Sequence, residues 1–122
     1  MSYVDGMVIP VTTSRKAEYR EKAEGWHRLL KEYGATRVVE CWGSDVPDGK
    51  LTDLKRAVQA EPTETVVFSF VMWPSKEVRD AGNAKLRTDP RAQMSGDMPF
   101  NMQRMIFGGF EVLMDSAGEL NR

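Results

Sequence analysis

Four charged residues interrupt stretches that otherwise carry the apolar and β-branched side chains of strands. Asp5, Glu40 and Glu111 lie within these stretches, and Arg104 stands at the start of the last one. A charge in a sheet that is covered on both faces must be paired or must border a cavity. In a cavity, the carboxylate of Glu40 or Asp5 could act as a general base, and Arg104 could hold an anionic group.

The sequence leaves two interpretations of these charges open. In the first, they form ion pairs between strands or between subunits and fix the register of a dimer. In the second, they line a pocket that binds or protonates a small polar molecule. Trp42, Trp73 and Glu111 are the ligand-binding candidates of the second interpretation, because they lie near the other charges along the strands.

His27 and Cys41 are the only histidine and the only cysteine. His27 lies at the edge of the apolar stripe of a predicted helix, so it is either a half-buried structural residue or a general acid or base. A reactive thiolate needs a positive environment, and the residues around Cys41 predict a packed, inert thiol instead. The sequence holds no phosphate-binding loop, no nucleophile elbow and no metal-ligand spacing, so we expect neither cofactor nor metal.

Hydrophobic patterning predicts four strands and two helices in the order βαββαβ. We expect strands at residues 3–11, 36–42, 65–73 and 104–114. The first helix should run from the hydroxyl-rich residues 12–14 to about residue 33, and the second from Ser75 to residue 88. Residues 50–63 fit either a helix or an extended arm. The order describes one α+β, ferredoxin-like domain over residues 1–122, with a core at about 3–115 and both helices on one face of an antiparallel sheet.

The second helix is expected to turn small residues toward the sheet and charged ones toward solvent. The inward set is Val78, Ala81, Gly82 and Leu86, and the outward set is Arg79, Asp80 and Asn83.

The third and fourth strands are apolar on both faces, although two helices can cover only one. Residues 65–73 carry phenylalanine, valine or tryptophan at both parities, and residues 105–114 behave alike. Leaving each large apolar side chain in water forgoes about 1.5–3 kcal/mol. A second copy is the simplest cover, giving a homodimer in the form of a dimeric α/β barrel. The alternative is that residues 50–63 or the C-terminal tail fold back over this face.

The composition limits the binding partners and the cellular compartment that we expect for the protein. The net charge is −1, from 17 basic and 18 acidic side chains without a basic cluster, so we do not expect nucleic acid as the main partner. No apolar run reaches the ~18 residues of a membrane span, and the single cysteine gives no internal disulfide. We expect a cytoplasmic protein that does not enter a membrane.

Several motifs, in order and over about residues 3–115, resemble the YbaA-like small bacterial proteins. They include Tyr3-Val4-Asp5-Gly6, Val39-Glu40-Cys41-Trp42, Asp45-Val46-Pro47-Asp48-Gly49-Lys50, Asp89-Pro90-Arg91, Met98-Pro99-Phe100 and the run from Arg104 to Glu111. The resemblance implies a ferredoxin-like subunit whose sheet packs against its twin, and it implies no activity, because that family has none established.

Two functions therefore stay open, and the sequence does not decide whether the protein is an enzyme. One is a homodimer that binds or transforms a small polar molecule in a cavity between sheet and helices. The other is a non-enzymatic dimer that acts as a protein-interaction or regulatory module. The lining of an internal cavity would separate them.

Overall fold

A computed structural model describes residues 2–118 of the chain. The helices, strands and 3₁₀ turns are β1 (Tyr3–Thr12), η1 (Thr13–Arg15), α1 (Lys16–Glu32), β2 (Arg37–Trp42), α2 (Leu54–Ala57), β3 (Glu64–Trp73), α3 (Lys76–Thr88), η2 (Pro90–Ala92) and β4 (Ile106–Glu111).

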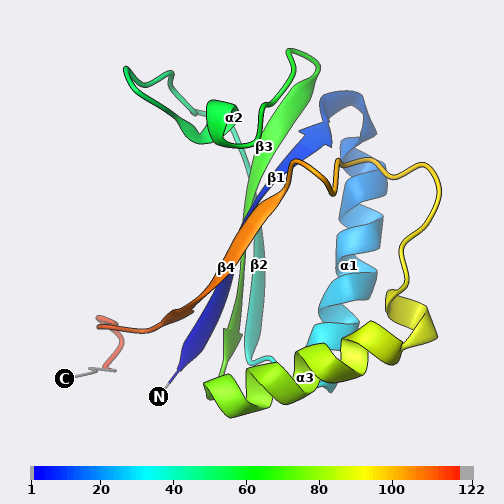
Figure 1. Cartoon of the computed structure of the whole chain (residues 1–122), viewed down its shortest axis with the longest axis vertical. Coiled ribbons are helices and arrows are strands. Elements are labelled where there is room, and N and C mark those ends of the chain that lie inside the picture. Colours follow the sequence, from blue (N-terminus) through cyan, green and yellow to red (C-terminus); the bar gives the residue numbers. More distant parts are fainter. Residues whose placement is uncertain (1, 119–122) are drawn as a thin grey trace.

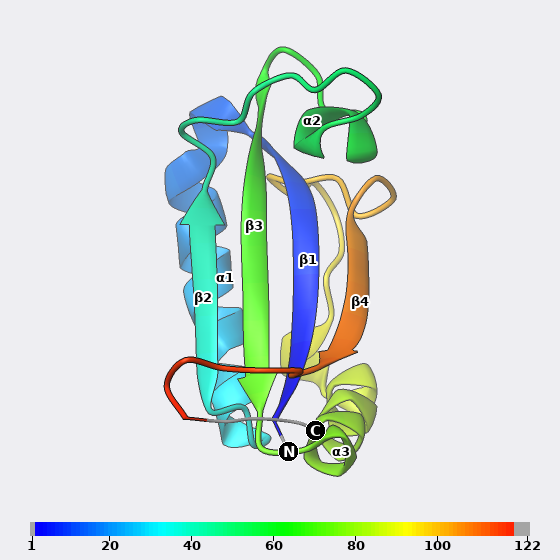
Figure 2. The same cartoon turned by 90° about the vertical axis from the view of Figure 1, so that its left-hand side faces the viewer.

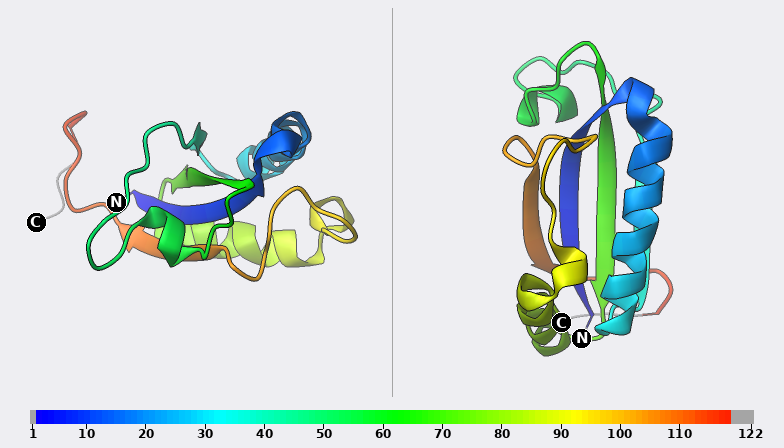
Figure 3. Two further views of the ribbon diagram at one scale, coloured as in Figure 1. Left: turned by 90° about the horizontal axis from the view of Figure 1, so that it is seen from above. Right: turned by 90° about the vertical axis from the view of Figure 1, so that its right-hand side faces the viewer.

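The four strands form one antiparallel sheet in the order β2-β3-β1-β4. The two central strands pair along their whole length, from Tyr3 opposite Trp73 to Thr12 opposite Glu64. Helices α1 and α3 both lie on one face of the sheet, and the other face carries no helix along its middle (Figures 1 and 3). The α+β class is thus confirmed, and the arrangement is consistent with the predicted ferredoxin-like order.

Local chemistry explains where the helices begin and end. Ser75 caps α3 by accepting a hydrogen bond from the backbone N–H of Val78, and α3 stops before Asp89, whose extended backbone leads into Pro90. Gly34 follows α1 with a φ of 113°, a left-handed conformation that favours glycine. The expected hydroxyl cap of α1 is wrong, because residues 13–15 form the turn η1 and no side chain caps either element.

The covered face holds two apolar clusters, which are aligned along the sheet. One gathers the N-terminal end of β1 and the C-terminal ends of α1, β3 and α3, with Tyr3, Leu29, Leu30, Ala35, Val71, Trp73 and Leu86. The other gathers the opposite ends of the same strands and the start of α1, with Ile9, Val11, Tyr19 and Val67. Met7 packs against both clusters.

Helix α3 approaches the sheet at Gly82. A Cβ added there would lie 2.8 Å from the ring of Trp73 and 3.1 Å from the backbone oxygen of Tyr33, so only glycine fits this contact. Of the inward set, Gly82 and Leu86 are buried, but Ala81 is exposed, which corrects its assignment. The outward assignments of Arg79 and Asn83 are also wrong. The guanidinium of Arg79 turns to Asp5 on the sheet, and Asn83 lines a cavity between the helix and the sheet.

Residues 43–63 form a projecting arm rather than a full helix, since α2 spans only four residues. Within the arm, Arg56 donates hydrogen bonds to the backbone oxygens of Gly49 and Leu51, and Asp53 caps α2. The last strand is shorter than expected, because residues 101–104 turn around the side chain of Asn101 before β4 begins.

The open face carries exposed aromatic and aliphatic side chains. Phe68 is 48% exposed and Phe110 60%, and a shallow apolar groove across the middle of the face includes Val8, Phe70 and Ile106. The arm and residues 112–118 project on this side at opposite ends of the sheet (Figures 1 and 2). Within residues 2–118, neither segment covers the middle of the face. The exposed phenylalanine side chains there confirm that the second face of the sheet is also apolar, as expected.

Candidate functional site

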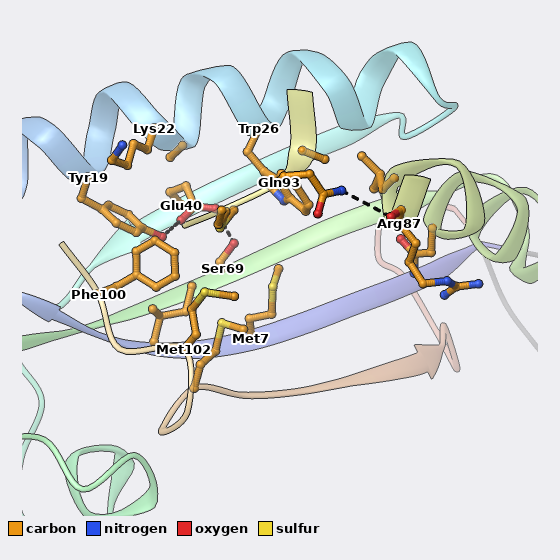
Figure 4. Close-up of a pocket in the computed structure, with 17 residues that line it drawn as sticks. Met7, Tyr19, Lys22, Trp26, Glu40, Ser69, Arg87, Gln93, Phe100 and Met102 are labelled. Atoms are coloured by element: carbon orange, nitrogen blue, oxygen red, sulfur yellow. Dashed lines mark hydrogen bonds between the residues drawn. The ribbon is translucent and has the colours of Figure 1, made fainter. Parts of the chain in front are cut away.

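A cavity of about 550 Å³ lies between the covered face of the sheet, α1, α3 and the segment that follows η2 (Figure 4). It occupies the seam where the two apolar clusters meet. Its walls are Met7, Ile9, Tyr19, Lys22, Ala23, Trp26, Glu40, Ser69, Asn83, Leu86, Arg87, Ala92, Gln93, Met94, Phe100, Met102 and Met105. This size falls within the usual range of small-molecule sites.

Glu40 is the only acidic residue among these walls, and three side chains meet at its carboxylate. The hydroxyl of Tyr19 donates a hydrogen bond to Oε1, and the hydroxyl of Ser69 donates one to Oε2. Nε2 of His27 lies 3.3 Å from Oε2. Donors of this kind offset the cost of keeping a carboxylate out of bulk water, so the cluster orients an acidic group at the cavity floor.

Strand alternation and strand register bring this cluster together. Glu40 shares the covered side of β2 with Val38 and Trp42, because side chains alternate along a strand. Ser69 is its direct neighbour across the β2–β3 pair and is fully buried. Tyr19 is buried near the start of α1, and His27 follows two turns later along the same helix.

Tyr19 is held in its neutral form. Burial, assisted by the nearby charge of Glu40, raises the pKa of its phenol well above the ordinary value. The phenol therefore remains a hydrogen-bond donor at any physiological pH, and it orients Glu40 without neutralising it.

The other walls are mostly aromatic rings and thioethers. The rings of Tyr19 and Phe100 pack edge to face, with centroids 5.8 Å apart, and Trp26 borders the same space. Four methionines add flexible, polarisable surface; they are Met7, Met94, Met102 and Met105. Such walls suit the apolar part of a ligand.

The structure does not gather the four charged strand residues into one site. Asp5 receives hydrogen bonds from Arg79 and from the indole N–H of Trp73, at 2.8 and 3.0 Å. The Asp5 carboxylate also raises the pKa of Arg79. This cluster ties α3 to the sheet, and Gly109 makes room for it, since a Cβ there would lie 2.8 Å from the guanidinium of Arg79.

Arg104 lies outside the cavity walls, at the base of the arm. Its guanidinium pairs with Glu64 at 2.6 Å and donates to the backbone oxygens of Val58 and Gln59. The pairing lowers the pKa of Glu64. These contacts make Arg104 an anchor for the arm, and they place its guanidinium away from Glu40 and the cavity.

The remaining candidate residues, Glu111, Trp42 and Cys41, lie outside the cavity walls. Glu111 is exposed on β4, and the half-buried ring of Trp42 lies under Lys16, whose Nζ is 4.9 Å from the ring centroid. Cys41 is exposed on the open face opposite Phe68, so the expected packed thiol is wrong for the single chain. The prediction failed because alternation turns Cys41 away from the helices.

Sequence reasoning missed Tyr19 and Ser69 as partners of Glu40, and it missed the lining residues of α3 and the segment after it. One signal was available: Ser69 lies between the apolar residues Val67, Val71 and Trp73 on one side of β3. A lone polar residue at a fully buried strand position must find a hydrogen-bond partner, and Glu40 is that partner.

Within residues 2–118, no three acidic, histidine or cysteine side chains are grouped as metal ligands. The helices in the same part of the chain are all too short or too polar to cross a bilayer.

Fold and site together define a small α+β protein with an open apolar sheet face and a carboxylate at the floor of a half-open cavity. A family model described as "Protein of unknown function (DUF1428)" matches residues 2–102, and the chain belongs to this family. The "Uncharacterized protein YbaA" of Escherichia coli strain K12 is 56% identical over 116 residues, which cover 94% of this chain and 99% of that protein. Proteins of the same description from Escherichia coli O157:H7 and Shigella flexneri match with the same identity and coverage.

Proposed function

We propose that the protein is a cytoplasmic homodimer in which each protomer binds a small, largely apolar molecule with one polar group in the cavity above Glu40. The observation that carries this proposal is the placement of Glu40. A carboxylate that is 20% exposed and is oriented by Tyr19 and Ser69 faces a cavity of ligand size with aromatic walls.

The cavity walls support binding of one defined class of molecule. Apolar walls favour a hydrophobic body, and a few placed polar groups fix its orientation. Glu40 offers acceptor oxygens at the floor, while Asn83 and Gln93 offer amide groups elsewhere in the lining. A molecule that is polar throughout would leave the aromatic and methionine walls unused.

The open face supports pairing through the sheet. The two central strands have 10 residues and extend about 33 Å, the two edge strands have 6 residues and extend about 20 Å, and the four strands span roughly 15–19 Å. The face therefore measures on the order of 400–500 Å². The arm, with Leu51 at 96% exposure, and residues 112–118 extend the surface on the same side. A stable interface buries about 800 Å² per partner, so the proposed pairing uses the arm and residues 112–118 as well as the sheet face.

A cavity-filling variant tests the ligand site. Ala23 lines the cavity from α1, whereas Ala17 is exposed on the same helix. We expect a screen of small aromatic compounds, read by thermal shift, to yield ligands whose binding Ala23→Phe abolishes and Ala17→Phe leaves intact. Unchanged binding to Ala23→Phe would place those ligands elsewhere and refute the site.

A further inference from the structure

We propose that the cavity takes an organic cation, an ammonium or quaternary ammonium group on an apolar body, and that this cation competes with a proton on His27 for the Glu40 carboxylate. The inference rests on the proposed small-molecule site. It adds the charge of the ligand and the dependence of binding on pH.

The hydrogen-bond partners of Glu40 leave the charge of its carboxylate uncompensated. Its two hydroxyl partners, Tyr19 and Ser69, donate hydrogen bonds but carry no positive charge. Tyr19 also stays protonated, since burial raises the pKa of its phenol. With a neutral His27, the carboxylate is a net negative charge in partly desolvated surroundings. A ligand cation beside it is attracted more strongly than it would be in water.

The second step is the aromatic lining. Trp26, Tyr19 and Phe100 present rings to the same cavity, and the faces of such rings attract cations within about 6 Å. The methionine sulfurs add polarisable contacts for alkyl groups on nitrogen. Lys22 and Arg87 also belong to the lining, but both residues are exposed, so water and salt screen their charges.

The third step is the position of His27. It is not among the cavity walls, its side chain is 26% exposed, and its Nε2 lies 3.3 Å from Glu40 Oε2. Glu40 therefore stands between the cavity and a histidine that reaches solvent. A proton on His27 would pair with the carboxylate from outside, and a ligand cation would pair with it from inside. The protonated His27 and the ligand cation cannot both pair fully with the single carboxylate charge, so each weakens the binding of the other.

The charged neighbours of this pair come from α1, β2 and α3. On α1, Glu24 and Lys31 lie about one turn before and after His27. On β2, Trp42 follows Glu40 on the covered side under Lys16, and Ser69 on β3 is uncharged. From α3, Arg87 reaches the same cavity. Carboxylate, lysine and arginine side chains ordinarily keep their charge between pH 5.5 and 8, whereas imidazole titrates within that range.

The test uses benzyltrimethylammonium, a permanent cation whose own charge does not vary with pH, and benzyl alcohol as the neutral probe with the same ring. Calorimetric titrations of the full chain would run from pH 5.5 to pH 8. We expect the cation to bind about tenfold more tightly at pH 8 than at pH 5.5, and benzyl alcohol to show no such change.

Three variants separate the parts of the proposal. Glu40→Gln should weaken the cation at least about tenfold at pH 8 while sparing benzyl alcohol. His27→Gln should bind the cation with the same affinity at every pH. Glu21→Gln, an exposed change on the same helix and more than one turn from His27, should behave like the parent protein. Circular dichroism would verify the folding of each variant, and the benzyl alcohol affinity would report an intact cavity.

The outcomes distinguish this inference from the proposed function. Equal affinity for both probes, or full cation binding by Glu40→Gln, would overturn the cation assignment and leave the cavity as a neutral site. A pH dependence that persists in His27→Gln would overturn the competition. Absence of binding by both probes, together with a screen that Ala23→Phe does not affect, would overturn the small-molecule site itself.

Discussion

The two faces of the same sheet present neighbouring residues of β3 to different surroundings. Ser69 turns to the covered face, is fully buried and donates a hydrogen bond to Glu40. Phe68, one residue earlier, turns to the open face and is 48% exposed. On the covered face a polar group is enclosed and satisfied, whereas on the open face a large aromatic ring lies in water. The first arrangement is typical of a ligand site and the second of an interface.

The two faces also differ in how tightly their side chains are packed. On the covered face, α3 approaches so closely that Gly82 has no room for a Cβ beside Trp73. On the open face, Phe68, Phe110 and Ile106 have no protein contacts over much of their surface. Substitutions on the covered face should therefore change stability, and substitutions on the open face should change association.

The largest expected effect concerns the open face. Phe68→Asp would bury two carboxylates in a two-fold interface, so we expect the dissociation constant of the proposed dimer to rise at least about 100-fold. Sedimentation at micromolar concentration measures this change. Ala84→Asp, at an exposed position of α3, is the matched control and should leave the mass unchanged. A parent protein that already sediments as one chain would contradict the pairing.

The next largest expected effect concerns the close contact of α3 with the sheet. Gly82→Ala should lower the free energy of unfolding by about 1–3 kcal/mol, because the added methyl group displaces the buried ring of Trp73. Gly25→Ala on α1 is the control: its Cβ would meet only the end of the Arg28 side chain, and alanine favours the helix by up to about 1 kcal/mol. Urea denaturation measures both, and equal effects of the two changes would contradict the tight contact.

A smaller effect concerns the stability of the folded protein at alkaline pH. The raised pKa of Tyr19 means that the folded protein keeps this proton at pH values where the unfolded chain releases it. The resulting stability is complete below the ordinary tyrosine pKa of about 10 and is lost as the pH rises above it. Tyr19→Phe should therefore flatten the fall of stability above pH 10.

Tyr33 should account for part of the alkaline dependence that remains. Its hydrogen bond to Asp89 also raises the pKa of its phenol. Urea midpoints between pH 9 and pH 11 would measure the difference, and an identical slope in the parent and in Tyr19→Phe would show that the Tyr19 phenol is not buried beside Glu40.

The smallest expected effect is on the thiol of Cys41, which lies on the open face opposite Phe68. Pairing through this face would cover the thiol, so its reaction with a disulfide reagent should slow as protein concentration rises into the micromolar range. The monomeric Phe68→Asp variant should react at one rate throughout. A parent rate that is independent of concentration would argue that Cys41 lies outside the interface.

The sequence predicted most of the fold because its local signals agree with the tertiary arrangement. Alternation in β3, the cap at Ser75 and the glycine after α1 all act within a few residues, and each element lies where these signals place it. The arm was not predictable in this way. Its shape depends on Arg104, which lies 46 and 45 positions after Val58 and Gln59 and holds their backbone oxygens.

The candidate site was predictable only in part for the same reason. Glu40 and His27 stood out as a charge in an apolar strand and as a unique residue type. Their meeting point depends on the distance between α1 and β2, which no local pattern reports. Asp5 looked equivalent to Glu40 in the sequence, yet the structure pairs it with Arg79, because α3 brings a guanidinium to one carboxylate and not to the other.

A crystal structure of the protein grown with millimolar benzyltrimethylammonium would test the division between the two faces most directly. We expect the quaternary nitrogen in the cavity beside Glu40 and the ring of Trp26, and the open faces of two copies packed on each other about 10 Å apart. An unfilled cavity with the cation on the open face, or open faces left in solvent, would contradict this assignment of the ligand to one face and the partner to the other.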